Sequence, residues 1–470
     1  MSQRVHNSRF INIFYLLKAA VTGAEEEFTK GSINRAIFML SVPMILEMMM
    51  ESLFAVVDVF FVAKLGVDAV ATVGLTESML MIIYSLAWGM SMGATAVVAR
   101  RTGEKDKDGA AHAGMQAIYV GGAISIMLSI AGLVFAKDLL LMMGASPALV
   151  EANASYAQIM LGGNIVIIML FLINGVFRGA GDAAIAMRSL WLANGLNIIL
   201  CPTLIYGIGP IPAMGLAGAA IATTIGRGAG VCYQVYHLFK GRGYIKILRK
   251  HISPDMPIMV NVIKMASGGT AQFLIASASW IFLVRIISHF GNDALAGYTI
   301  GIRIIAFTIM PAWGMANAAA TLVGQNLGAQ QPDRAETSAW RASLFNMIFL
   351  CTIAIVFFIF AKDLVMIFNK DAAVVHHGVE CLRYVCLGYM FYGYGMVLSQ
   401  AFNGAGDTKT PTILNLLGFW AFQIPLAYCL AIVLDWGPKG VFSAIAIAES
   451  AIAVAAIILF RRGKWKLVKV

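Results

Sequence analysis

Three carboxyl side chains share one face of the first long apolar segment of the chain. Glu47, Glu51 and Asp58 fall at about 0°, 40° and 20° around an α-helix and extend along about 16 Å of it. A charged carboxyl group inside a membrane costs about 2.5–3.5 kcal/mol, and poor solvation favours its protonated form. The stripe therefore suits a proton or sodium path, unless Glu47 and Glu51 pair with basic side chains or line a wet cavity.

The composition indicates a membrane protein built of helices. Of the 470 residues, 60% are hydrophobic and 12% are charged, and the mean hydropathy is +0.80. Soluble domains carry about 25% charged residues, whereas about 20 apolar residues cross a bilayer as an α-helix. Strands of a membrane barrel would instead alternate over about ten residues. Twelve segments have the length of a spanning helix, at about 36–62, 70–99, 111–135, 155–177, 186–208, 215–239, 258–287, 294–322, 338–361, 379–402, 412–434 and 439–460.

The chain repeats itself at a constant offset. Phe177–Asp182 returns as Phe402–Asp407, and Trp88 and Trp313 have the same separation (402 − 177 = 313 − 88 = 225). A repeat of this length is two halves of one fold rather than a solenoid unit. Each half has six spans, an even number, so both halves enter the membrane in the same orientation. We therefore expect an all-α membrane protein with twelve transmembrane helices in two parallel six-helix repeats, related by a pseudo-twofold axis along the membrane normal.

Basic residues mark the cytoplasmic side of this arrangement. The net charge is +10, but Lys and Arg gather in both termini, after the second span and between the repeats. By the positive-inside rule both termini are cytoplasmic, and the charge reflects topology rather than binding to nucleic acid. The run Phe10–Val21 predicts a cytoplasmic or interfacial amphipathic segment rather than a signal peptide. The expected parts are a cytoplasmic N-terminal segment (1–30), an N-terminal six-helix lobe (31–240), a cytoplasmic linker (241–257), a C-terminal six-helix lobe (258–461) and a basic cytoplasmic tail (462–470).

Several motifs at matching helix positions resemble one family of transporters. Pro43 and Asp58 lie on the first span, and Phe177–Asp182 and Phe402–Asp407 follow the fourth and tenth. The other motifs are Leu65-Gly66, Asn197–Leu200, Gly215–Thr223 and Val323–Ala329. Together they resemble the multidrug and toxic compound extrusion (MATE) family, in the branch compared with DNA-damage-inducible protein F. The resemblance implies a cation-coupled antiporter that exports amphipathic, often cationic, organic compounds by alternating access.

The resemblance also implies a cation site in the N-terminal half. Asp58 stands where the family has its functional carboxylate on helix 1. Comparable places on helices 4, 5 and 6 are filled by Asn174, Asn197 and Thr223. Cys201 stands where the resemblance leads us to expect aspartate; a thiol is a poor ligand for a hard cation, which favours H+ over Na+ and points to Glu51 together with Asp58. Asn194, one turn before Asn197, either takes part or forms a helix–helix hydrogen bond.

The second half lacks the acidic stripe. The offset of 225 residues carries Glu47, Glu51, Asp58 and Asn197 onto Gln272, Ala276, Leu283 and Phe422. Coupling is therefore expected through the N-terminal lobe. Glu449, near the middle of the last span, is an exception, and we expect it to form a structural ion pair with Arg285 or Arg303, because an unpaired charge there would be costly.

The substrate cavity is marked only by residue type. Thioethers and aromatic rings suit promiscuous binding, so Met48, Tyr389 and Tyr392 are candidate contacts, although such residues also fill cores and lipid-facing surfaces. No Ser/His/Asp set, HExxH motif or Cys/His metal spacing occurs, so we expect no enzyme, no metal and no cofactor beyond the coupling ion. We expect a monomer in the bacterial inner membrane that binds small organic molecules. The alternatives are a flippase for lipid-linked oligosaccharides, against which the scarcity of intramembrane arginines argues, and a membrane receptor that does not transport.

Overall fold

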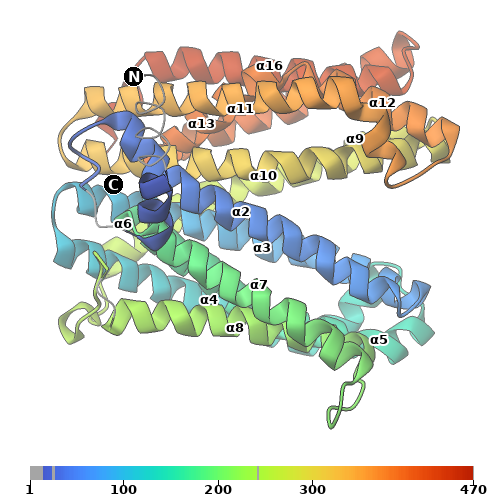
Figure 1. The fold of residues 1–470 in the computed structure, drawn as a ribbon, viewed down its shortest axis with the longest axis horizontal. Helices are drawn as coiled ribbons and strands as arrows, with labels where there is room; N and C mark the ends of the chain where they lie inside the picture. Colours follow the sequence, from blue (N-terminus) through green and yellow to red (C-terminus); the bar gives the residue numbers. More distant parts are fainter. Residues whose placement is uncertain (1–13, 24–26, 241–242, 469–470) are drawn as a thin grey trace, which may run out of the picture. The chain divides into compact units, whose positions relative to one another are not determined.

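The computed structural model describes residues 14–23, 27–240 and 243–468. All regular structure in these ranges is helical and forms the expected spans (Figure 1). Nine helices of the described part are by themselves long and apolar enough to cross a membrane. The first six spans are α2 (Ile33–Ala63), α3 (Val67–Gly103), α4 (Lys107–Met142), α5 (Pro147–Gly162) with α6 (Asn164–Ala180), α7 (Ala183–Tyr206) and α8 (Gly215–Lys240). The last six are α9 (Met256–Ser288), α10 (Asn292–Gly328), α11 (Pro332–Met366), α12 (Ala372–Cys386) with α13 (Tyr389–Gly404), the stretch from α14 (Lys409–Asn415) through α15 (Ile424–Tyr428) to η3 (Cys429–Val433), and α16 (Pro438–Arg461).

The duplication seen in the sequence recurs in the backbone. The fourth span of each repeat is broken at equivalent places, at Gly163 after α5 and at Gly388 before α13 (388 − 163 = 225). The turns after these spans also match, since Gly181 and Gly406 have φ angles of 91° and 90°. Residues with side chains rarely adopt this conformation, which explains why glycine is present at both turns.

The chain packs as two compact units. Unit 1 comprises Met1–Glu27 and Val42–Thr270, and unit 2 comprises Phe28–Ser41 and Ala271–Val470. Long helices run side by side within each unit (Figure 1). The start of α2 therefore belongs to unit 2, where Arg334 holds the preceding residues through hydrogen bonds to three backbone carbonyls. The start of α9 belongs to unit 1.

The predicted amphipathic segment at the N-terminus is helical from Phe14 to Thr22, and its residues 10–13 lie outside the described ranges. Phe14 and Tyr15 expose most of their side chains. Arg188 on α7 donates to the carbonyl of Thr22 at 2.5 Å, near the end of the helix, where carbonyls lack helical partners. The segment is thus attached to unit 1.

The eleventh span departs from the regular repeat. Its counterpart α7 is an α-helix throughout, whereas π-helical turns occupy Leu416–Gln423 and Cys429–Val433. A π-turn contains an extra residue and rotates the side chains that follow it. The offset carries Asn197 onto Phe422, which is exposed, while the adjacent Gln423 is buried. The buried amide of this span therefore lies one residue later than the offset predicts.

The segment that joins the two repeats is fixed to α4. Gln116 donates to the carbonyl of Ser253 at 2.9 Å and accepts from the amide of Asp255 at 3.0 Å. Tyr119, on the same face of α4, donates to the carbonyl of Ile252 at 2.8 Å. These contacts make the end of the linker part of unit 1 rather than a free connection.

A Gln116→Ala variant is expected to expose the linker to protease. It removes two hydrogen bonds, each worth about 1 kcal/mol, so trypsin should cut the exposed sites Lys246, Arg249 and Lys250 about 30-fold faster. Limited proteolysis of the purified protein measures this rate. Ser125→Ala is the control, because that hydroxyl bonds within its own helix, and equal rates in the two variants would contradict the role of Gln116.

Candidate functional site

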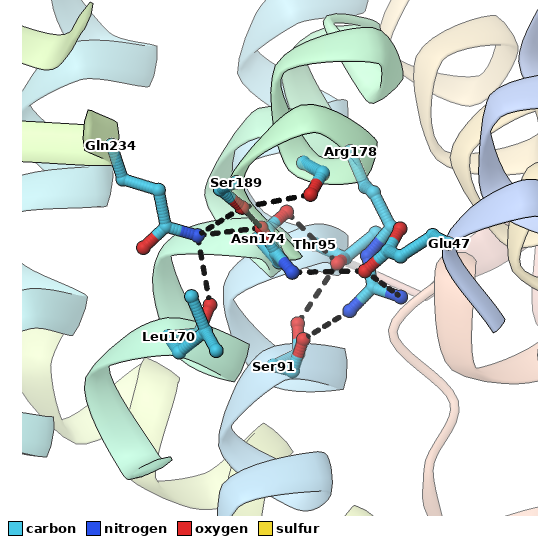
Figure 2. Close-up of polar contacts among 10 residues, drawn as sticks. Glu47, Ser91, Thr95, Leu170, Asn174, Arg178, Ser189 and Gln234 are labelled. Carbon is cyan, nitrogen blue, oxygen red and sulfur yellow. Dashed lines mark hydrogen bonds and ion pairs between the residues drawn. The ribbon is translucent and has the colours of Figure 1, made fainter. Parts of the chain in front are cut away.

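A buried ion pair joins α2 to α6 within unit 1. The carboxylate of Glu47 lies 3.8 Å from the guanidinium of Arg178, and both side chains are buried. Asn174, one turn before Arg178, donates from Nδ2 to the same carboxylate oxygen at 2.9 Å. Arg178 also donates to Oγ of Ser91 on α3 at 2.6 Å (Figure 2). Oε1 of Glu47 is therefore paired with a cation and hydrogen-bonded, while its Oε2 is buried without a donor in the described part of the chain.

Asn174 extends this pair to α7 and α8. Its Oδ1 accepts from Ser189 Oγ at 3.0 Å and from Gln234 Nε2 at 2.5 Å. Gln234 also donates to Ser189 Oγ at 3.1 Å and to the carbonyl of Leu170 at 3.0 Å. Figure 2 shows Asn174 between Glu47 on one side and Gln234 on the other. One amide thus connects side chains from four helices, and such networks hold a buried site in a single arrangement.

A second ion pair joins α2 to α8. The Glu51 carboxylate accepts from Nη2 of Arg227 at 2.9 Å, and only 1% of the arginine side chain is exposed. Aromatic rings surround the guanidinium, whose central carbon lies 4.9 Å from the ring centre of Phe54, 5.6 Å from that of Phe171 and 5.7 Å from that of Tyr84. The negative faces of such rings stabilise a desolvated cation. Glu51 is thus the partner of a tightly enclosed arginine.

Asp58 differs from the other two acids of the stripe. Its Oδ1 accepts the thiol of Cys201 on α7 at 3.5 Å, and its side chain is half-buried. Among the described residues, no lysine or arginine lies within ion-pair distance of Asp58. The three carboxyl groups of α2 therefore face two guanidinium groups, which leaves Asp58 as the acid without a cationic partner.

The amide side chains of α7 bond to the neighbouring helices α2 and α8. Asn197 donates to Thr223 Oγ1 on α8 at 3.0 Å, and Asn194 donates to the carbonyl of Met50 on α2 at 3.2 Å. Asn194 thus forms a helix–helix hydrogen bond, one of its two expected roles. In the described part of the chain, Oδ1 of each asparagine is buried without a hydrogen-bond donor. These two oxygens are therefore acceptors that a proton donor or a cation could use.

Unit 2 carries a neutral version of the first ion pair. Gln272 and Asn403 occupy the positions of Glu47 and Arg178 (272 − 47 = 403 − 178 = 225). Their amides bond reciprocally at 3.0 and 3.1 Å, and Asn403 also donates to Gln400 at 3.3 Å. The two units therefore share the contact between these helices but not its charge.

The prediction that Glu449 forms an ion pair with Arg285 or Arg303 is wrong. No ion pair joins Glu449 to Arg285 or Arg303 among the residues that the structure describes, and both arginine side chains are exposed. A long arginine side chain can reach the edge of a bilayer from within a span, so it need not pair with a buried acid. Glu449 instead lies within electrostatic reach of Tyr392.

The candidate substrate residues do not gather in one described unit. Met48 is buried in unit 1, while Tyr389 and Tyr392 belong to unit 2, where Tyr389 is buried and Tyr392 half-buried. Tyr389 packs with its ring centre 6.1 Å from that of Phe357. These residues stay candidates for substrate contact.

Sequence reasoning found Thr223 but missed the rest of the polar face of α8. Thr223, Arg227 and Gln234 have the spacing of the acidic stripe (227 − 223 = 51 − 47 = 4; 234 − 223 = 58 − 47 = 11). They therefore share one face of their helix, as the acids do. This match between two polar stripes was the available signal for Arg227 and Gln234. Ser189, by contrast, carries no such signal.

No group of three or more His, Cys, Asp or Glu side chains that could hold a metal ion occurs in the described residues.

Two repeats of six spanning helices, with buried ionisable groups among the helices of unit 1, define a membrane transporter. The MatE family model matches residues 43–203 and 270–429. The chain belongs to this family of multi-pass transporters, and its all-helical architecture of twelve spans in two repeats is the architecture of the family.

Curated relatives resemble the chain over nearly its whole length. The probable multidrug resistance protein NorM of Thermotoga maritima is 24% identical over 92% of this chain and 93% of its own. The multidrug export protein MepA of Staphylococcus aureus (strain N315) is 23% identical over 92% of this chain and 94% of its own.

Solved structures agree with this assignment. An outward-facing multidrug resistance MATE family transporter of the MOP superfamily has 28% identity and a TM-score of 0.87, over 93% of this chain and 96% of that one. A MOP superfamily transporter from Pyrococcus furiosus, described by a binding pocket of reverse polarity, has 27% identity and a TM-score of 0.86 over 94% and 98%.

Proposed function

We propose that this protein is a proton-coupled antiporter that exports amphipathic or cationic organic compounds by alternating access and takes up its coupling proton at Asp58. One observation carries the proposal: Glu47 and Glu51 each have a buried arginine partner, whereas Asp58 has a thiol. A carboxyl group gains most from a proton where no cation already neutralises it. Glu47 and Glu51 then position the helices, and Asp58 exchanges the proton.

The charge of the site explains why proton and substrate would exclude each other. With the two ion pairs of α2 formed, an ionised Asp58 contributes a negative charge that no arginine neutralises, and Glu77 on α3 adds to the negative potential there. An organic cation is attracted to that charge, and a proton removes it. Protonation of Asp58 would therefore favour release of a cationic substrate.

The organic substrate class and the cellular setting belong to the same proposal. The relatives named for multidrug resistance or multidrug export support the export of diverse organic molecules. We place the protein in the bacterial inner membrane as a monomer with both termini in the cytoplasm. The exposed basic residues of the linker support this orientation, since such residues gather on the cytoplasmic side.

Transport by purified protein in liposomes tests the proposal. A fluorescent organic cation should move against its gradient when a proton gradient alone is imposed, without sodium on either side. The lumen from which protons leave should become more alkaline as substrate enters it. A requirement for a sodium gradient, or substrate movement without any pH change, would overturn the proposal.

A further inference from the structure

We propose that Arg227 is a built-in counter-ion that closes the cation site of unit 1 to sodium. The inference rests on the proposed coupling of this site to cations and names the residue that selects which cation can enter. Arg227 lies on α8, four residues after Thr223, and its guanidinium binds the carboxylate of Glu51 on α2. It thus occupies a place where a mobile cation would otherwise be needed.

The surroundings of Arg227 enclose it at this place. Its Nε and Nη1 have no hydrogen-bond acceptor in the described part of the chain, and the rings of Phe54, Tyr84 and Phe171 cover the group instead. An arginine that could reach water would satisfy all five of its N–H donors. This one donates to the Glu51 carboxylate at 2.9 Å and to the Tyr84 hydroxyl at 3.4 Å, and aromatic rings cover the rest of the group. Its position therefore follows from the attraction of Glu51 and from the enclosing helices.

A second cation has little reason to bind beside this one. The charged and ionisable groups that act on the guanidinium are Glu51, Asp58 and Tyr84. Glu51 is already neutralised, and a sodium ion bound near it would be repelled by Arg227 across a short distance in a poorly polarisable interior. Sodium also needs several oxygen ligands at once, whereas Cys201 supplies a thiol to Asp58. A proton needs only one oxygen and no coordination shell.

The same geometry indicates what removal of Arg227 would create. Glu51 would become a buried carboxylate without a counter-ion, beside helices that already carry unpartnered acceptors. Oδ1 of Asn197 is one of these, and Asn197 bonds to Thr223, one turn before Arg227 on α8. Carboxylate and amide oxygens are suitable ligands for a hard cation. The Arg227→Met variant should therefore gain a sodium site that the wild type lacks.

Thermal unfolding of the detergent-purified protein tests this without any transport assay. Midpoints are compared in sodium chloride and in choline chloride at equal ionic strength. We expect the same midpoint in both salts for the wild type. Arg227→Met should unfold at a lower temperature in choline, and sodium should raise its midpoint in a saturable way, because a ligand that binds only the folded state stabilises it.

Three variants serve as controls. Glu51→Gln/Arg227→Met removes both charges and should show no response to sodium. Arg227→Lys keeps a cation in place and should show none either. Arg303→Met removes an exposed arginine from a helix of unit 2 and tests whether loss of positive charge alone causes the effect.

Each outcome decides the matter. Sodium protection of the wild type overturns the proposal, and so does a folded Arg227→Met variant that does not respond to sodium. If Arg227→Met is recovered unfolded in choline but folded in sodium, the proposal is supported; if it is unfolded in both, sodium does not replace the guanidinium and the idea fails. If proton-driven transport fails in liposomes, the proposed function is wrong, but the sodium response of Arg227→Met is unaffected by that result.

Discussion

The Arg178→Asn variant is expected to lose about 3–5 kcal/mol of stability, because it leaves the Glu47 carboxylate buried without its cation. The protein itself contains the compensating change. Unit 2 fills the equivalent positions with Gln272 and Asn403, whose amides bond to each other. The double variant Glu47→Gln/Arg178→Asn copies that neutral pair into unit 1 and should recover most of the loss.

Thermal unfolding of the two single variants, the double variant and the wild type gives the coupling between Glu47 and Arg178. A large favourable coupling is expected, since each single change leaves the other charge unpaired. If the double variant is as unstable as Arg178→Asn, the ion pair does not account for the role of the arginine. Its bond to Ser91 would then be the more important contact.

The Asp58→Asn variant is expected to lose proton-driven export altogether. Asparagine keeps the shape of the side chain and its Oδ1 can still accept the Cys201 thiol, but it cannot bind and release a proton. In liposomes, efflux driven by a pH gradient should fall to the level of protein-free vesicles. Exchange of substrate down its own gradient should persist, because the ion pairs of Glu47 and Glu51 in unit 1 are intact.

Glu449→Gln is the matched control for this experiment. It removes another carboxyl group from a spanning helix, but one that lies in unit 2 and outside the stripe of α2. Proton-driven efflux should survive this change. Undiminished coupled transport by Asp58→Asn, or its loss in Glu449→Gln alone, would show that the coupling proton is carried elsewhere.

The spans and their duplication could be predicted from the sequence because both depend on local chemistry. A helix must bury its own backbone polar groups to cross a bilayer, so the length of an apolar run is nearly sufficient evidence for a span. Interruptions within spans were not foreseen. The breaks at Gly163 and Gly388 and the π-helical turns at Leu416–Gln423 depend on how neighbouring helices pack, which a hydropathy pattern does not record.

The site was predictable along one helix and not between helices. The shared face of Glu47, Glu51 and Asp58 follows from helix periodicity alone. The partners follow from tertiary packing, so Arg227 was missed although it binds Glu51 at 2.9 Å. The rule that a buried acid must pair with a base was applied to Glu449, where it failed, yet it holds for Glu47 and Glu51. The rule gives the free-energy cost of an unpaired buried charge, but it does not say which basic residue forms the pair.

The boundaries between the two units have a mechanical consequence. They fall inside helices, at Ser41/Val42 within α2 and at Thr270/Ala271 within α9, rather than in loops. Each boundary lies beside residues that weaken a helix, Pro43 in the first case and Gly268-Gly269 in the second. Proline removes a backbone hydrogen bond, and each glycine costs about 1 kcal/mol relative to alanine in a helix interior.

A bend in α2 or α9 is therefore expected first at these points, where the helical backbone is weakest. Glu47 lies one turn after Pro43 on α2. Its ion pair with Arg178 therefore fixes the part of α2 that belongs to unit 1.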